Sequence, residues 1–252
     1  QELMAKEATV CMLDDKHQDA APALRLKLGT LNVQGMGNKW HSIRLVTTKQ
    51  QLHILSLQET KTMNLPKIRN MEVFVINNHA SIDVKNKLGV ALYVHKSLNP
   101  SLCPEACNPE LECICVVIRI KSKKISVFAC HNKPNSHDSI LHIKNYVCDK
   151  SDDAGMPIDF IIMGDLNTHH PTLGPTRRPI NEAGRLTVEL LTRTGAVTCN
   201  DEQPTRKHST LDHIILSPNL SNDITYEVKC GLQSDHDICL LYTSPSPRDT
   251  MS

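Results

Sequence analysis

The amino-acid sequence predicts a layered α/β domain. Short apolar segments typical of strands alternate along the chain with segments whose apolar residues recur at helical spacing. Two of the apolar segments, residues 158–164 and 211–216, are nearly all apolar, which is typical of central strands covered on both faces. Strands that alternate with helices in this way form layered α/β domains. A chain of 252 residues is also long enough for one large domain, at about 150 residues per domain on average.

The predicted elements begin with a strand, a helix and a second strand. Residues 24–33 alternate in hydropathy like a half-buried strand, and residues 40–51 carry apolar side chains at helical spacing. The second strand is expected at residues 53–57. Further strands are expected at residues 71–76, 88–95, 111–120, 124–131, 158–164 and 211–216. Helices are expected between the later strands, at residues 137–148 and 181–194.

Composition excludes several classes of protein. The formal net charge is only +1, so no strong overall field attracts the chain to a polyanion or a membrane surface. No apolar segment approaches the roughly 20 residues that span a bilayer, and the first residues lack the apolar core of a signal peptide. The sequence contains 10 cysteines, and their scatter favours free thiols in a reduced intracellular protein. We therefore expect no membrane partner.

Three regions are expected along the chain. Residues 1–23 are acidic and weakly periodic, which predicts a disordered leader or linker. Residues 24–238 form the expected folded domain, which is mildly basic once the leader is set aside. Residues 239–252 are expected to be a non-native tail, because they resemble translated sequencing-adapter sequence. The absent initiator Met also suggests a fragment of a longer protein.

Polar side chains stand at the ends of the predicted strands. Carboxylate, amide and imidazole groups occur there in five separate segments: Asn32, Glu59, Asp165 with Asn167, Asp212, and Asp235 with His236. Any one of them can be a turn residue or a helix cap. Because strand ends in a layered α/β fold meet at one crevice, where ligands commonly bind, their joint occurrence predicts a shared site.

The chemistry of these groups favours a hard cation and phosphate-ester hydrolysis. Carboxylates and amides without thiolates suit Mg²⁺, with Mn²⁺ as an alternative, better than zinc. A metal held by Glu59 can neutralise charge on the nonbridging oxygens, and Asp165 can orient or deprotonate a water. His236, with Asp212 as its partner, can stabilise the transition state as a cation.

The motifs resemble those of the exonuclease-endonuclease-phosphatase superfamily, and they occur in the same order along the chain. The matching segments are Leu31-Asn32-Val33, Ser56-Leu57-Gln58-Glu59-Thr60, Gly164-Asp165-Leu166-Asn167, Leu211-Asp212-His213-Ile214 and Ser234-Asp235-His236. Within the superfamily, the segment Gly164 to His170 and the segment Ser209 to Asp212 resemble the apurinic-like endonuclease domain of non-LTR retrotransposons.

This resemblance implies a fold, an activity and a set of partners. The fold is a four-layer α/β sandwich, in which two packed mixed β-sheets are flanked by helices. The activity is a Mg²⁺-dependent nick in DNA that leaves a 3′-hydroxyl to prime a C-terminal reverse transcriptase domain. The implied localisation is intracellular, with synthesis in the cytoplasm and action in the nucleus.

The resemblance also implies roles for single residues. Asn32 and Glu59 line the metal site, and Asp235 completes it. Asp165 and Asn167 handle the nucleophile and the phosphate. His236 completes the catalytic group, with Asp212 behind its imidazole.

One position departs from the family pattern. The family usually has a Tyr at the end of the strand before a Pro-Asn turn, where this chain has His131 or Asn132. His131 can donate an equivalent hydrogen bond to a phosphate, or the change can mark a decayed copy. A catalytically dead remnant that binds nucleic acid is therefore an alternative, and a phosphoinositide- or sphingomyelin-type phosphoesterase of the same superfamily is another.

Four basic residues lie between the Asp165 and Asp212 motifs. They are Arg177, Arg178, Arg206 and Lys207. They can contact DNA phosphates or form a scattered, solvated set. The sequence leaves both interpretations open.

Overall fold

The computed structural model describes residues 26–62, 64–76, 89–150, 155–200, 202–222 and 224–243. The expected leader at residues 1–23 and the last residues of the expected tail lie outside these ranges. The strands are β1 Lys27–Asn32, β2 Ile54–Gln58, β3 Met71–Ile76, β4 Val90–His95, β5 Ser101–Leu102, β6 Cys113–Ile120, β7 Lys123–His131, β8 Asp159–Asp165, β9 Val197–Thr198, β10 Asp212–Leu216, β11 Ile224–Lys229 and β12 Ile238–Thr243. The α-helices are α1 Trp40–Lys49, α2 Asp138–Asp149 and α3 Glu182–Thr194. Short 3-10 helices are η1 Gly37–Lys39, η3 Lys96–Leu98, η4 Pro104–Ala106, η5 Pro171–Leu173 and η6 Pro218–Leu220.

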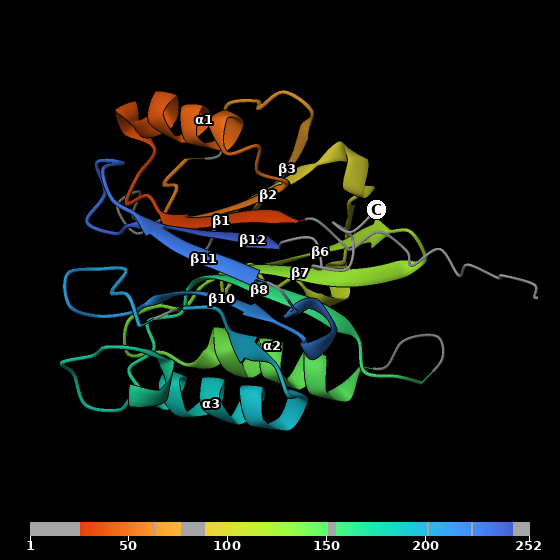
Figure 1. Ribbon diagram of the computed structural model, residues 1–252, viewed down its shortest axis with the longest axis vertical. Coiled ribbons are helices and arrows are strands. Elements are labelled where there is room, and N and C mark those ends of the chain that lie inside the picture. The colour runs from red at the N-terminus through yellow and green to blue at the C-terminus, as the bar shows by residue number, and fades with distance from the viewer. Residues whose placement is uncertain are drawn as a thin grey trace, which may run out of the picture.

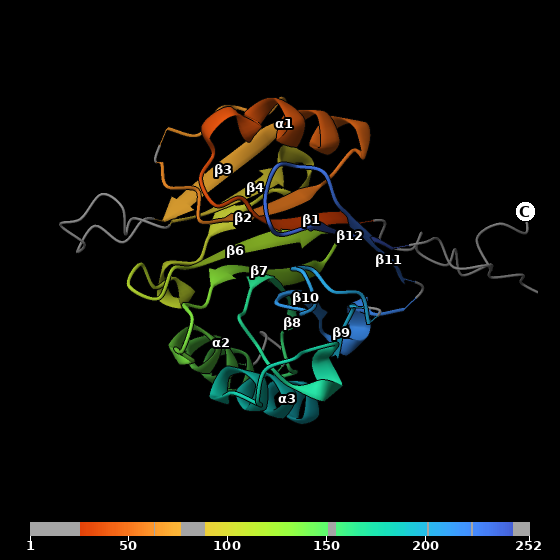
Figure 2. The ribbon, with the colours of Figure 1, turned by 90° about the vertical axis from the view of Figure 1, so that its left-hand side faces the viewer.

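Two mixed sheets pack face to face. The first sheet has six strands in the order β11-β12-β1-β2-β4-β3, and the second has six in the order β5-β6-β7-β8-β10-β9. The pairs β1/β2 and β7/β8 are parallel, and the other strand pairs are antiparallel. Helix α1 covers the outer face of the first sheet, while α2 and α3 cover the outer face of the second (Figures 1 and 2). The expected four-layer α/β sandwich is therefore confirmed.

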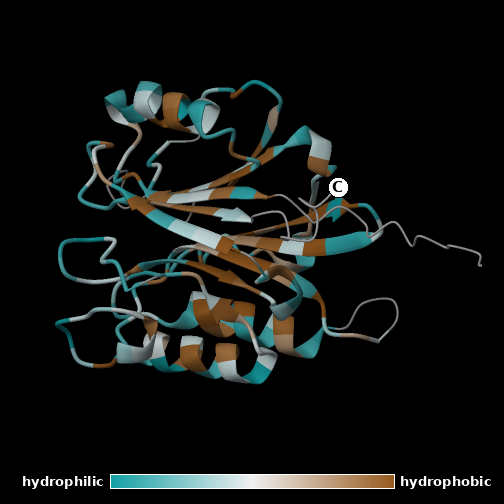
Figure 3. Cartoon of the chain, in the orientation of Figure 1, coloured by the Kyte–Doolittle hydropathy of each residue, from teal (hydrophilic) through white to brown (hydrophobic). Residues whose placement is uncertain are grey.

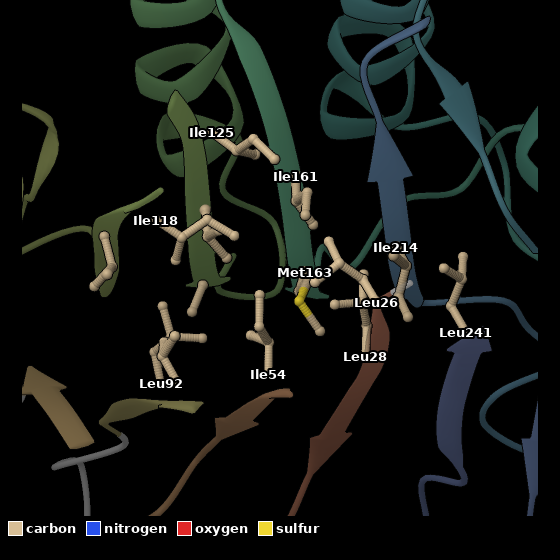
Figure 4. Close-up of a cluster of buried hydrophobic side chains, with 14 of the residues drawn as sticks. Leu26, Leu28, Ile54, Leu92, Ile118, Ile125, Ile161, Met163, Ile214 and Leu241 are labelled. Carbon is tan, nitrogen blue, oxygen red and sulfur yellow. The ribbon is translucent and has the colours of Figure 1, made fainter. Parts of the chain in front are cut away.

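Three apolar clusters hold these layers together. The central cluster lies between the sheets and includes Leu28, Ile54, Ile161, Met163 and Ile214, all with at most 1% of their surface exposed (Figure 4). A second cluster joins the second sheet to α2 and α3, and a third joins the first sheet to α1. The hydropathy colouring shows apolar residues along the strands and on the inner faces of the helices (Figure 3). Burial of apolar surface, at about 25 cal/mol per Å², is the main favourable term for such a fold.

The last strand extends beyond the expected domain boundary at residue 238. β12 pairs with β1 on one side and with β11 on the other, through Thr243. Cys239, Leu240 and Leu241 are completely buried in this strand. Residues 239–243 are therefore part of the folded sheet, although the sequence led us to assign them to the tail.

The topology brings the polar strand ends to one edge of the two sheets. β1 and β2 are parallel, so Asn32 at the end of β1 lies beside Gln58, which Glu59 follows. β7 and β8 are also parallel, so His131 and Asp165 end side by side. No helix in the described ranges is long and apolar enough to span a membrane.

Candidate active site

Asp165 occupies the centre of the site because of strand register. It is the last residue of β8, and it pairs with His131 of β7 on one side and with Asp212 of β10 on the other. The preceding Gly164 has a φ of +153°, and an added Cβ there would meet the carbonyl oxygen of Cys130 at 1.9 Å. Glycine at this position therefore lets β7 approach β8 closely just before the site.

The Asp165 carboxylate is buried and held from two directions. Its Oδ2 accepts a hydrogen bond from Nδ2 of Asn32 at 2.9 Å, and its Oδ1 accepts one from the backbone N–H of Asn167 at 3.0 Å. Burial and the nearby negative charge of Asp212 raise the pKa of Asp165 to about 6. The charges of His131 and His236 and the hydrogen bond from Asn32 limit this rise. The carboxylate is thus fixed in place and poised to exchange a proton near neutral pH.

Asp212 and His236 form a buried pair next to Asp165. Nδ1 of His236 is 2.7 Å from Oδ2 of Asp212, and Nε2 is 3.8 Å from Oδ2 of Asp165. Burial opposes the charged imidazole, but the hydrogen bond to Asp212 and the charges of Asp212 and Asp165 together raise the pKa of His236. Within the described ranges, Nε2 of His236 is buried and has no hydrogen-bond partner. An imidazolium edge that lacks a partner suits an anionic substrate atom.

Thr205 holds the Asp212 carboxylate in position. Its hydroxyl donates to Oδ2 of Asp212 at 2.7 Å and accepts the backbone N–H groups of Leu211 and Asp212, both at 3.0 Å. The carbonyl of Thr205 also accepts the N–H of Asp237, next to His236. The buried Thr205 therefore contacts both the segment that carries Asp212 and the segment that carries His236.

Glu59 lies at the end of the first sheet, directly after β2. Its Oε1 accepts a hydrogen bond from Nδ2 of Asn32 at 2.9 Å, and its Oε2 lies 3.3 Å from Nζ of Lys61. Burial opposes the charged form, but Asn32, His131 and Lys61 together lower the pKa of Glu59. Asn32 thus bridges Glu59 of the first sheet and Asp165 of the second.

His131 and Asn132 are the two residues that could stand where the family pattern has a Tyr. Of these two, His131 faces the site. Its Nε2 is 3.8 Å from Oε1 of Glu59, and its Nδ1 is 2.7 Å from Oε2 of Glu112. The amide of Asn132 instead donates to the backbone carbonyls of Ser136 and Leu166. Burial opposes the charged form of His131, but the hydrogen bond to Glu112 and the charges of Asp165, Glu112 and Glu59 raise its pKa.

Asp235 stands at the edge of this group, with 33% of its side chain exposed. Arg206 donates to Oδ2 of Asp235 from Nε at 2.9 Å and from Nη2 at 2.7 Å. Its Oδ1 is 3.7 Å from Nε2 of His236. The negative charge of Asp235 is thus compensated by Arg206.

The four basic residues between the motifs gather around one pocket. Arg177, Arg178, Arg206 and Lys207 line a pocket of about 400 Å³ together with Asn167, His169 and His208. Asn167 has a φ of +48°, and its amide donates to the carbonyl of Asn132 at 2.7 Å. The pocket therefore places a strongly basic lining next to Asn167 at the site. The four basic residues form one group and are not scattered over the surface.

Two groupings of side chains can hold a cation. In the described ranges, ligand atoms of Asp165, Asp212 and His236 all lie within 4.8 Å of one another. Oδ1 of Asp212 has no hydrogen-bond partner among the described residues. Glu59 and Asp165 form the second grouping, in which two carboxylates supply the oxygens and Nδ2 of Asn32 donates to both. A divalent metal therefore fits this site, and an oxygen donor set suits a hard cation.

Sequence reasoning missed Glu112 and Thr205. Glu112 follows Glu110 by two positions at the start of an apolar strand, and Thr205 lies in a polar loop, so neither stands out by pattern. Both are completely buried, and both hold a site residue through its side chain. A charged residue directly before a buried strand is the one signal that marks Glu112.

Known proteins share both the sequence pattern and the fold. A family described as "Endonuclease-reverse transcriptase" matches residues 125–240. The endonuclease domain of TRAS1, a telomere-specific non-LTR retrotransposon, is similar with a TM-score of 0.69 and 17% identity, covering 86% of this chain and 98% of that one. AP endonuclease LMAP from Leishmania major gives 0.69 and 14%, covering 88% of each chain. An AP endonuclease from Archaeoglobus fulgidus gives 0.62 and 16%, covering 86% and 98%. A search of the curated proteins found no match.

The fold and the family match point to the same resemblance. Both agree with the resemblance to the exonuclease-endonuclease-phosphatase superfamily that the ordered motifs indicate. Within that superfamily it resembles the endonuclease domain of a non-LTR retrotransposon. The fold is shared with these endonucleases.

Proposed function

We propose that the chain is a divalent-metal-dependent endonuclease that nicks DNA. The observation that carries this proposal is the buried Nε2 of His236, which has no hydrogen-bond partner among the described residues and lies 3.8 Å from Asp165, while Nδ1 of the same ring bonds to Asp212. A charged donor and a fixed carboxylate on one crevice can act together on a phosphodiester, whose transition state gathers negative charge on its oxygens. The basic pocket beside Asn167 adds a place for neighbouring phosphates.

We assign the metal to the carboxylate of Glu59, with Asp165 beside it and Asn32 holding both carboxylates through Nδ2. The hydrogen bond to Asp212 engages Nδ1 of His236, and the raised pKa of this imidazole favours the protonated form, which has no lone pair for a metal. Mg²⁺ prefers oxygen ligands, with Mn²⁺ as the alternative. When bound, the ion neutralises charge on the nonbridging oxygens of the scissile phosphate. Asp235, although expected at the metal, has the role of holding Arg206 next to His236 in this proposal.

The side chains of the site then divide the remaining work. Asp165 orients the attacking water and accepts its proton, since its pKa lies near neutral pH. Nε2–H of His236 donates to the phosphate as charge develops, and Asp212 keeps the ring in position. His131 gives a second donor from the side of β7. Asn167 holds the loop that joins the site to the basic pocket.

The likeness to the TRAS1 domain supports a retrotransposon role. In that role the nick leaves a 3′-hydroxyl that primes a reverse transcriptase domain farther along the polyprotein. Synthesis in the cytoplasm and action in the nucleus follow from it. The matched family, described as "Endonuclease-reverse transcriptase", supports the same partner domain.

Specific observations argue against the other two candidate functions. A phosphoinositide- or sphingomyelin-type phosphoesterase shares the site, but a basic pocket for several phosphates favours a polymer. A decayed remnant would be expected to lose the contacts of its motif residues. Here the hydrogen bonds among Asn32, Glu59 and Asp165 are complete, and so is the bond from His236 to Asp212.

A substrate panel separates these candidates. The purified full chain is incubated with Mg²⁺ and, in separate reactions, supercoiled plasmid, phosphoinositide vesicles and sphingomyelin vesicles. We expect nicked plasmid and no release of lipid phosphate or phosphocholine. Lipid hydrolysis without nicking would support the phosphoesterase. A folded protein that binds DNA and cuts nothing would support the remnant.

A further inference from the structure

We propose that Glu112 is a positioning residue of this site, which holds His131 so that its Nε2 faces the substrate phosphate. The proposal rests on the proposed function and deepens it. It gives a role to a residue that no motif marks. Its evidence is a pair of side chains 19 positions apart that the fold brings into one buried hydrogen bond.

The burial of Glu112 requires a partner. Its side chain is completely buried, and its Oε2 lies 2.7 Å from Nδ1 of His131. Its Oε1 accepts the backbone N–H of Gly89 at 3.3 Å. In the described part of the chain, His131 is the basic group within ion-pair distance of Glu112. Because a buried carboxylate is unfavourable unless it is paired, Glu112 and His131 depend on each other.

The backbone also holds Glu112 at this place. It has a φ of +49°, in the left-handed region that non-glycine residues seldom adopt. Its carbonyl accepts the backbone N–H of His131 at 3.2 Å, at the point where β7 ends. Asparagine or glycine would suit this conformation better than glutamate does. The glutamate takes this conformation with its side chain turned inward to the imidazole.

The resulting geometry repeats that of His236. Nδ1 of each imidazole is 2.7 Å from a buried carboxylate oxygen. Nε2 of His131 is 3.8 Å from Glu59, and Nε2 of His236 is 3.8 Å from Asp165. Asn32 links these two acceptor carboxylates, so both imidazoles direct Nε2 at one bridged acidic group. Two oriented N–H donors then converge where a phosphate would lie.

The carboxylate of Glu112 determines what His131 can do. While Nδ1 donates to Glu112, its proton is fixed there and the ring cannot rotate without breaking a buried hydrogen bond. Nε2 therefore keeps one orientation toward the site. A neutral amide at position 112 would leave the ring free to turn or to change tautomer. We expect that change to slow the chemical step and to leave substrate binding nearly unaltered.

The experiment compares Glu112→Gln with a matched control, Glu110→Gln. Glu110 is exposed and lies two positions away. We expect Glu112→Gln to lower kcat for plasmid nicking by about tenfold or more, with KM nearly unchanged. Glu112→Asp should recover part of the loss, and Glu110→Gln should match the wild type. The double variant Glu112→Gln/His131→Ala should be no slower than His131→Ala, because the two residues act as a unit.

A proton NMR measurement makes the outcome independent of activity. We expect a low-field imidazole N–H resonance that is present in the wild type and lost in both Glu112→Gln and His131→Ala. If the wild type nicks plasmid and Glu112→Gln nicks it at the same rate, the positioning role is overturned. Losses of kcat that add in the double variant would also overturn it. A wild type that does not nick would overturn the proposed function and this role with it. The low-field resonance would then report only a structural hydrogen bond.

Discussion

The imidazole of His236 meets the carboxylate of Asp212 across a 2.7 Å hydrogen bond at the edge where the two sheets end. Asp212 opens β10, whereas His236 lies in the loop before β12, so the two residues come from different sheets. Their contact therefore joins the two halves of the sandwich at the site. It also turns Nε2 of His236 toward Asp165.

Weakening this hydrogen bond should remove catalysis without unfolding the protein. Asp212→Asn keeps the shape of the side chain but removes the charge that orients and stabilises the imidazolium. We expect kcat for nicking to fall by about 100-fold or more, with a smaller change in KM. Initial rates over a range of plasmid concentrations give both values. A variant as active as the wild type would contradict the assigned role of Asp212.

Ionisation of Asp165 should follow the charge at position 212. The negative charge of Asp212 disfavours a second negative charge on Asp165 and contributes to its pKa of about 6. In the metal-free protein, ¹³C NMR of the labelled carboxyl group should show a midpoint near that value. Asp212→Asn should move the midpoint to lower pH. A midpoint that stays in place would mean that the two carboxylates do not interact.

The stability of the fold should decrease at alkaline pH. His131 and His236 have pKa values raised in the folded state, so each stabilises the fold fully below the unfolded pKa of about 6.5. That contribution is lost as the pH rises through the folded pKa. Thermal melting from about pH 6.5 to 9 should therefore show a falling Tm. In Asp212→Asn the slope should be shallower, and an equal slope would contradict the assignment.

The basic pocket should govern DNA affinity rather than the chemical step. Arg177→Ala/Arg178→Ala removes two charges from its lining, and we expect KM to rise while kcat changes little. The dependence of binding on salt should also weaken, by about one in slope for each phosphate that the variant no longer binds. Arg193→Ala on α3, whose side chain is 51% exposed, is the control. Equal salt slopes in all three proteins would exclude phosphate binding at this pocket.

Metal binding should depend on Glu59 more than on His236. Electron paramagnetic resonance titration with Mn²⁺ should give an affinity at least about tenfold weaker in Glu59→Gln and nearly unchanged in His236→Gln. Glu72→Gln on the exposed face of β3 is the control. The reverse pattern would assign the ion to the group formed by Asp165, Asp212 and His236.

Much of the fold could be predicted from local pattern. The strand Met71–Ile76 has the expected bounds, and the helices α1, α2 and α3 begin and end within about two residues of the expected positions. The prediction failed for β11, although its residues alternate between apolar and polar side chains, with Glu227 and Lys229 at polar positions of this edge strand. It also failed at β12, where a resemblance to adapter sequence led us to set aside residues that pair on both sides.

A site residue could be predicted from the sequence where a motif marks it. It was harder to predict where only the tertiary structure places it next to the site. Asn32, Glu59, Asp165 and His236 stand at strand ends, and the register of the sheets brings them together. Glu112 was missed because its partner lies 19 positions away and its left-handed backbone leaves no mark in composition. The Arg206 contact that compensates Asp235 depends on a loop, which periodicity does not describe.

The measurement that tests the central claim most directly is nicking of supercoiled plasmid by the purified chain. It is run with Mg²⁺ and with EDTA, for the wild type, Asp165→Ala and His236→Ala, each confirmed as folded by circular dichroism. We predict Mg²⁺-dependent conversion to the open circular form by the wild type alone. Intact plasmid with folded wild type, or equal nicking by the variants, would contradict the assignment of this site as a metal-dependent nuclease.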